Sequence, residues 1–135
     1  MARENVGILE TVRRAIAAVN ARDVEGYLSL CTPDVELHTP VEAVGGAYVG
    51  TEGIRRFFAD IEDAGPDFHL AIHDLQALAT GCVLAAMSVA STGRSSGIPV
   101  GAETTNVYWF AEDRINCIRV FRDRAEALDA VGLEE

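Results

Sequence analysis

Residues 104–121, Thr-Thr-Asn-Val-Tyr-Trp-Phe-Ala-Glu-Asp-Arg-Ile-Asn-Cys-Ile-Arg-Val-Phe, decide the fold class. This stretch contains two runs rich in β-branched and aromatic residues, separated by Glu112-Asp113, a pair typical of a tight turn. Two earlier runs have the same character and are also bounded by turn residues. The sequence therefore predicts four consecutive strands, at 68–78, 82–91, 104–111 and 115–121.

The N-terminal third has the residue spacing of helices instead. Apolar residues recur at intervals of three and four along about four turns, at Ile8, Val12, Ala15, Ile16 and Val19. Asp23 is the expected N-cap of a second, shorter helix that Pro33 ends. The apolar face of this second helix is formed by Val24, Tyr27, Leu28 and Cys31.

Two further helices are predicted. One follows the glycine-rich loop around Tyr48, with Thr51 as its expected N-cap and Gly65-Pro66 as its end. Its apolar face comprises Ile54, Phe57, Phe58 and Ile61. A short closing helix is indicated by Ala125, Leu128 and Val131, followed by Gly132.

The order of these elements predicts an α+β fold. Residues 35–39 alternate with period two, which indicates an early half-buried strand that ends before Pro40. Three helices followed by a four-stranded meander, with the early strand added at an edge, differ from a repeating βαβ order. A curved, mostly antiparallel sheet around the helices would leave a conical apolar cavity, the usual place for a small-molecule site. We expect one domain spanning residues 1–135.

Composition excludes several classes of partner. The formal charge of −10 disfavours binding to nucleic acid or to an anionic membrane. The longest apolar run, residues 82–87, is far shorter than the ~20 residues that span a bilayer, and charged residues interrupt the N-terminus where a signal peptide would be apolar. We therefore expect a cytoplasmic protein. Cys31, Cys82 and Cys117 share no metal-binding spacing and are expected to be reduced core thiols.

Several segments together resemble the nuclear-transport-factor-2-like superfamily, and within it SnoaL-like proteins and ketosteroid isomerases. The matching segments are 11–23, 34–40, 50–58, Gly97-Ile98-Pro99, 106–110 and 123–133. The resemblance covers nearly the whole chain and implies a cone-shaped, cystatin-like fold. It does not imply one activity, because this superfamily contains isomerases, cyclases, hydrolases and non-catalytic binding proteins.

The isomerase chemistry of this superfamily transfers poorly to the sequence. Thr39 occupies the position of the carboxylate base, and a hydroxyl group is not a base at neutral pH. Ala15 replaces the first hydrogen-bond donor to the enolate, whereas Asn106, at the position of the second donor, can still donate. Classical ketosteroid isomerisation is therefore not expected.

The SnoaL-type polyketide cyclases resemble the sequence better. They close a ring without a cofactor, and the aspartate that serves as their acid/base corresponds to Asp123. Enclosed by apolar walls, this carboxyl group would have a raised pKa suited to proton transfer. The spacing of Asp123 and Glu126 is equally typical of a helix N-cap, so both interpretations stay open.

The remaining candidate residues concern binding. His38 is the other candidate for proton transfer, although strand alternation directs it away from the face of Thr39. His69 and His73 lie ~13 Å apart along a strand, which disfavours a shared metal ion. We expect neither a metal nor a cofactor. The predicted walls of the substrate pocket are Tyr27, Thr39, Tyr48, Phe57, Met87, Asn106 and Tyr108.

Two functions are consistent with this set of residues. One is cofactor-independent acid/base chemistry, of the cyclase or isomerase type, on a small hydrophobic carbonyl compound. The other is non-catalytic binding of a small molecule or a partner. Both faces of the strand around Val107 and Tyr108 carry apolar residues, so we also expect a homodimer formed through the outer face of the sheet.

Overall fold

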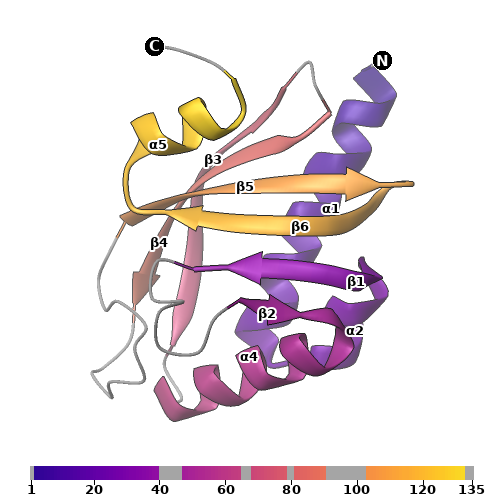
Figure 1. Ribbon diagram of the computed structural model, residues 1–135, viewed down its shortest axis with the longest axis vertical. Coiled ribbons are helices and arrows are strands. Elements are labelled where there is room, and N and C mark those ends of the chain that lie inside the picture. Colours follow the sequence, from indigo (N-terminus) through magenta and orange to yellow (C-terminus); the bar gives the residue numbers. More distant parts are fainter. Residues whose placement is uncertain (1, 40–46, 65–67, 79–80, 91–102, 133–135) are drawn as a thin grey trace.

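The computed structural model describes residues 2–39, 47–64, 68–78, 81–90 and 103–132 (Figure 1). Its helices are α1 (Ala2–Ala21), α2 (Val24–Ser29), α4 (Gly50–Ala64) and α5 (Arg124–Ala130). Its strands are β1 (Cys31–His38), β2 (Tyr48–Val49), β3 (His69–Ala77), β4 (Val83–Ala90), β5 (Glu103–Ala111) and β6 (Arg114–Phe121).

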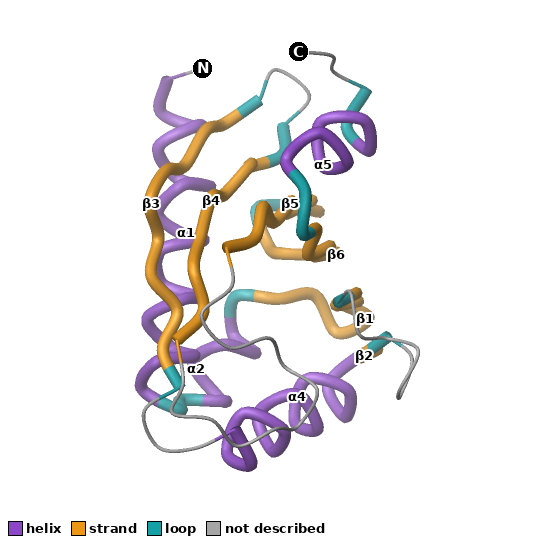
Figure 2. Tube along the Cα trace, turned by 90° about the vertical axis from the view of Figure 1, so that its left-hand side faces the viewer, coloured by secondary structure: helices purple, strands orange, loops and turns teal. Residues whose placement is uncertain are grey.

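All six strands form one sheet in the order β2-β1-β6-β5-β4-β3. The predicted meander is confirmed, because β3 to β6 are antiparallel neighbours in chain order. The early strand β1 joins β6 in parallel, and β2 adds the outermost antiparallel strand. Figure 2 shows β3 and β4 running along α1, β5 and β6 beside α5, and β1 and β2 above α4. The α+β fold with a curved, mostly antiparallel sheet is therefore confirmed.

The alternation of side chains divides the sheet into two faces. The inner face carries Met87 and Tyr108, which belong to the main core cluster together with residues of α1, α2 and α4. The outer face carries Leu84 and Val107, which form a smaller cluster with Leu128 of α5. α5 thus covers part of the apolar outer face, which the sequence analysis assigned to a second copy of the chain. The homodimer itself stays a prediction.

The apolar stripes predicted for the long helices are confirmed. All five stripe residues of α1 are buried, and in α4 Ile54, Phe58 and Ile61 are buried while Phe57 is half-buried. Asp23 caps α2 as predicted, because its Oδ1 accepts a hydrogen bond of 3.0 Å from the backbone N–H of Gly26. Asp123 likewise caps α5, and Gly132 follows that helix with a positive φ of 79°.

Three local predictions are wrong. α2 ends at Ser29, and Cys31 begins β1 opposite Ile115, so the cysteine belongs to a strand rather than to the helix. Pro33 lies within β1, where the register with β6 is irregular and the missing N–H of proline is tolerated. α4 begins at Gly50, which places Thr51 inside the first turn rather than before it.

The expected loop around Tyr48 also contains the short strand β2, which the sequence analysis missed. Two residues give too little pattern for a strand to be recognised. In the structure, Tyr48 lies opposite Leu37 and Val49 lies opposite Glu36. Pairing with β1 therefore fixes Tyr48 on the inner face of the sheet.

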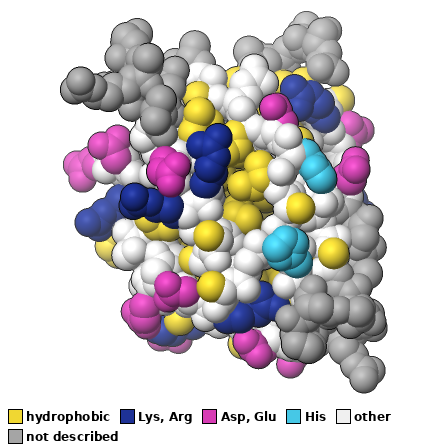
Figure 3. Space-filling view, turned by 180° about the vertical axis from the view of Figure 1, so that it is seen from behind, with side chains coloured by type: hydrophobic (Ala, Val, Ile, Leu, Met, Phe, Trp, Pro, Cys, Tyr) yellow, Lys and Arg dark blue, Asp and Glu magenta, His cyan; other side chains and the backbone are white. Residues whose placement is uncertain are grey.

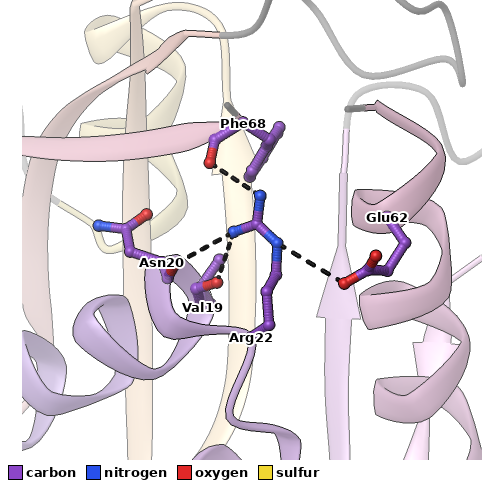
Figure 4. Close-up of polar contacts among 5 residues, drawn as sticks. All are labelled: Val19, Asn20, Arg22, Glu62 and Phe68. Atoms are coloured by element: carbon purple, nitrogen blue, oxygen red, sulfur yellow. Dashed lines mark hydrogen bonds and ion pairs between the residues drawn. The ribbon is translucent and has the colours of Figure 1, made fainter. Parts of the chain in front are cut away.

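Arg22 joins three elements at the C-terminal end of α1 (Figure 4). Its guanidinium group donates hydrogen bonds to the carbonyl oxygens of Val19, at 2.9 Å, and Phe68, at 3.0 Å, and its Nε lies 3.9 Å from the carboxylate of Glu62. The neighbouring Asn20 exchanges two side-chain hydrogen bonds of 2.9 Å with the backbone of Leu70. These contacts fix the first residues of β3 against α1 and α4.

Candidate functional site

A line of polar side chains lies on the inner face of β5. Thr104, Asn106 and Tyr108 follow one another at every second position, and each is at most 7% exposed. Their neighbours on β4 and β6 are apolar. Met87 lies opposite Thr104, Ala85 and Val120 lie opposite Asn106, and Val83 and Ile118 lie opposite Tyr108.

Hydrogen bonds orient the amide group of Asn106. The hydroxyl group of Thr104 donates to Oδ1 of Asn106 at 3.0 Å, which leaves the amide nitrogen as the donor end. Burial raises the pKa of Tyr108 well above its ordinary value, and a side-chain hydrogen bond from Asn106 lowers it in part. Tyr108 is therefore a neutral phenol at physiological pH.

Tyr27 and Cys31 add two further neutral groups to this cluster. Burial, with smaller contributions from Tyr108 and Cys31, raises the pKa of Tyr27 well above its usual value. Burial also raises the pKa of the Cys31 thiol to about 12. In the part of the chain that the structure describes, the Tyr27 hydroxyl group makes no hydrogen bond. A buried phenol without a partner can supply a hydrogen bond to a ligand.

Aromatic rings extend from this cluster toward β2. The ring of Tyr27 lies 5.4 Å from that of Phe58 and 6.5 Å from that of Phe57, which in turn lies 5.4 Å from the ring of Tyr48. The hydroxyl group of Tyr48 is already bonded to Asp60. Burial, followed by this hydrogen bond and the charge of Asp60, raises the pKa of Tyr48 to about 12. Tyr48 can therefore contact a ligand through its aromatic ring, whereas its hydroxyl group is already engaged by Asp60.

The two candidates for proton transfer lie elsewhere. His38 lies on the outer face opposite Arg119, as strand alternation predicted, and its Nε2 is 2.9 Å from a carboxylate oxygen of Glu36. Asp123 is exposed, and its Oδ1 accepts a hydrogen bond of 2.9 Å from the backbone N–H of Ala125. The helix-cap interpretation is confirmed, and the exposed Asp123 does not meet the condition of apolar enclosure attached to the catalytic interpretation. Its catalytic role stays a prediction.

The structure therefore divides the predicted site residues into two groups. Tyr27, Met87 and Tyr108 share the main core cluster, with Tyr48 and Phe57 packed against it and Asn106 on the same face of the sheet. The second group comprises His38, Thr39 and Asp123, which line an open depression of about 370 Å³. The other residues of its lining are Arg119, Val120, Phe121, Arg122 and Glu126. An apolar cavity at the first group stays a prediction.

A second depression, of about 700 Å³, lies between α1 and β3. It is lined by residues 69–75 and by Arg13, Ile16, Ala17 and Asn20. Seen from behind, the molecule shows hydrophobic side chains near the centre, with basic and histidine side chains around them (Figure 3). Both His69 and His73 are exposed, as expected, and the imidazole of His73 lies 3.0 Å from the hydroxyl group of Ser88. None of the predicted pocket residues lies in this depression.

Sequence reasoning missed two members of the buried polar cluster. Thr104 lies two positions before Asn106, so the alternation of β5 could have placed it beside that amide. Cys31 was assigned to the apolar face of a helix. Its place beside Tyr27 and Tyr108 depends on the pairing of β1 with β6, which no local pattern reveals.

Comparisons with known proteins agree with this architecture. A cystatin-fold protein from Novosphingobium aromaticivorans is 29% identical, with a TM-score of 0.70 over 84% of this chain and 97% of that one. TerC, crystallised with polyporic acid, is 21% identical, with a TM-score of 0.67 over 91% and 96% of the two chains. A candidate polyketide cyclase from Sinorhizobium meliloti is 16% identical, with a TM-score of 0.67 over 82% and 93%.

The remaining findings concern curated proteins, the length and polarity of the helices, and the family of the chain. In the comparison with curated proteins, no protein matches this chain. None of the helices in the described part of the chain is long and apolar enough to cross a membrane. The family model of the SnoaL-like domain matches residues 12–118, which include β1, β5 and most of β6. The chain therefore belongs to the family of SnoaL-like domains.

Proposed function

We propose that this SnoaL-like domain binds a small, neutral, hydrophobic molecule through a carbonyl oxygen at Asn106. The observation that carries the proposal is the amide of Asn106, which is 6% exposed and has apolar residues opposite it on both neighbouring strands. Its nitrogen has two hydrogens, and the hydrogen bond that lowers the pKa of Tyr108 can use only one of them. The second hydrogen is available to a carbonyl oxygen of a ligand.

The chemistry around Asn106 supports a neutral ligand. The phenols of Tyr27 and Tyr108 and the thiol of Cys31 keep their protons, because burial raises the pKa of each. The cluster thus offers hydrogen-bond donors without a positive charge, and moving an anion into such surroundings is costly. The similarity to a candidate polyketide cyclase supports a ligand that carries a carbonyl group.

A matched pair of probes tests this proposal. 2-Acetylnaphthalene carries a carbonyl oxygen, whereas 2-isopropylnaphthalene has nearly the same shape and no acceptor. We expect the wild-type protein to bind the ketone more tightly by roughly 3- to 10-fold, the value of one buried hydrogen bond. Asn106→Leu should abolish this preference while retaining affinity for the hydrocarbon. Quenching of the probe fluorescence measures all four dissociation constants.

Two outcomes would contradict the proposal. Equal affinity of the wild-type protein for both probes would show that no donor reaches the carbonyl oxygen. A preference that persists in Asn106→Leu would assign the donor to another residue. Tyr27→Phe then identifies whether the phenol of Tyr27 is that donor.

A second candidate function, acid/base catalysis, is favoured by the meeting of His38, Thr39 and Asp123 in one depression. Enolisation of a ketone is the elementary step of such chemistry, and it exchanges the methyl hydrogens of 2-acetylnaphthalene in D₂O. If Asp123 moves this proton, Asp123→Asn should slow the exchange by about 100-fold or more. Asparagine caps helices as well as aspartate does, so the fold should persist. NMR of the methyl signal measures the rate.

Asp129→Asn is the matched control for this experiment, because Asp129 is an exposed carboxylate on α5 outside the depression. It should exchange the probe at the wild-type rate. A wild-type protein that does not accelerate the exchange, or an Asp123→Asn variant as fast as Asp129→Asn, would leave binding through Asn106 as the proposed function.

A further inference from the structure

Three residues with different metal-ligating groups meet on the outer face of the sheet. Glu36 and His38 are two positions apart on β1, and therefore point to the same side. Cys117 of β6 lies opposite Glu36 in the parallel pairing of the two strands. One carboxylate oxygen, one imidazole nitrogen and the thiol sulfur all lie within 4.8 Å of one another. This cluster is separate from the inner face that carries Asn106.

We propose that Glu36, His38 and Cys117 form a binding site for a divalent transition-metal ion of the zinc type. Carboxylate, imidazole and thiolate are the three groups that bind Zn²⁺ in proteins, whereas Mg²⁺ and Ca²⁺ prefer oxygen ligands alone. Three protein ligands leave one position of a tetrahedron open to water. One carboxylate and one thiolate also balance the two positive charges of the ion.

The distances require only small rearrangements. Zinc–ligand bonds of about 2.0–2.3 Å place the ligand atoms of a tetrahedral site about 3.3–3.6 Å apart. The imidazole Nε2 of His38 and the nearest oxygen of Glu36 are now 2.9 Å apart, and the largest separation in the cluster is within 4.8 Å. Both side chains retain room to turn, with 29% and 49% exposed. Rotation about side-chain bonds can supply shifts of about 1 Å without moving the strands.

Arg119 is the positive charge nearest to this cluster along β6. It lies opposite His38 on the same face, so its charge opposes a bound cation. Its guanidinium carbon, however, lies 5.5 Å from the centre of the Phe121 ring, where a cation–π contact holds it. Metal binding replaces the thiol hydrogen of Cys117 by the metal–sulfur bond, and this proton leaves to the solvent.

Titration of the reduced, chelator-treated full chain tests the proposal. We expect Zn²⁺ to bind at one ion per chain by calorimetry, and Co²⁺ to produce the near-ultraviolet absorption of a cobalt–thiolate bond. Cys117→Ser should abolish this absorption. Cys117→Ser and Glu36→Gln should each weaken Zn²⁺ binding by at least about 10- to 100-fold, the loss seen even when a residue behind the ligands is removed. Glu36 is exposed, so its replacement leaves the fold intact.

His73→Gln is the matched control, because His73 is also exposed on the sheet but lies on β3, outside the cluster. This variant should bind Zn²⁺ with the affinity of the wild-type protein. The proposal is overturned if the wild-type protein shows no saturable binding, or if Cys117→Ser retains both the absorption and the wild-type affinity. Neither result would affect the ligand proposed at Asn106, which faces the opposite side of the sheet.

Discussion

Replacement of Asn106 by aspartate should make the stability of this domain strongly dependent on pH. The new carboxyl group would lie among Ala85, Val120 and the other apolar neighbours of Asn106, where its charged form is disfavoured. Thr104 and Tyr108 can donate hydrogen bonds that offset part of this cost. We therefore expect the pKa of the carboxyl group to rise by roughly three units in the folded state, below the five reached by fully isolated groups.

The sign of the effect follows from the raised pKa. The pKa of an aspartate in the unfolded chain is about 3.9. Below this pH the new carboxyl group is mostly protonated in both the folded and the unfolded state, so its ionisation costs the variant little stability there. Between about pH 4 and pH 7, the unfolded chain ionises first and the free energy of unfolding falls by about 1.4 kcal/mol per pH unit. Above this window the loss levels off at about 4 kcal/mol. Urea unfolding at several pH values, compared with the wild-type protein, measures the curve.

Asn106→Leu is the control for this experiment, because it removes the amide without adding a titratable group. Its stability difference from the wild-type protein should stay constant between pH 4 and pH 8. A pH-independent difference for Asn106→Asp as well would mean that water reaches this carboxyl group. The buried, apolar surroundings assigned to Asn106 would then be incorrect.

Replacement of Gly53 by alanine should destabilise the domain by about 1–3 kcal/mol. Gly53 lies in the first half of α4, and a Cβ atom there would lie 2.7 Å from the backbone carbonyl carbon of Tyr48 and 3.1 Å from its Cα. Backbone atoms cannot turn away as a side chain does, so either α4 or β2 must shift. Urea unfolding of Gly53→Ala measures the cost.

Gly7→Ala is the matched control, because Gly7 also lies in a helix but no heavy atom would come within 4 Å of its Cβ. Alanine loses less conformational entropy in a helix than glycine, so this variant should gain roughly 0.5–1 kcal/mol. A lower free energy of unfolding for Gly53→Ala together with a higher one for Gly7→Ala would establish the close approach of α4 to β2. Equal stabilisation by both would show that α4 lies farther from Tyr48.

Much of the fold could be predicted from the sequence because the strongest patterns are local. The stripe from Ile8 to Val19 and the pattern from Ile54 to Ile61 each bury one face of a long helix, and periodicity alone identifies such faces. The strands of the meander pair with their neighbours in chain order. Local spacing and turn residues therefore suffice for these elements.

The errors occur where distant residues decide the structure. The spacing of Tyr27, Leu28 and Cys31 continues a helical pattern, but pairing with Ile115 draws Cys31 into a strand. The cluster of Glu36, His38 and Cys117 was missed for the same reason, since 79 positions separate His38 from Cys117. Asp123 matched a family position, and its spacing to Glu126 independently indicated the N-cap that the structure confirms.

The parallel pairing of β1 with β6 has a consequence for the order of folding. β1 ends at His38 and β6 begins at Arg114, so a long loop must close before the two strands can meet. Contacts between such distant positions slow folding relative to helical domains of similar size. During synthesis on the ribosome, one edge of β1 has no β6 to pair with until Phe121 has emerged, and until then this open edge can pair with other nascent chains.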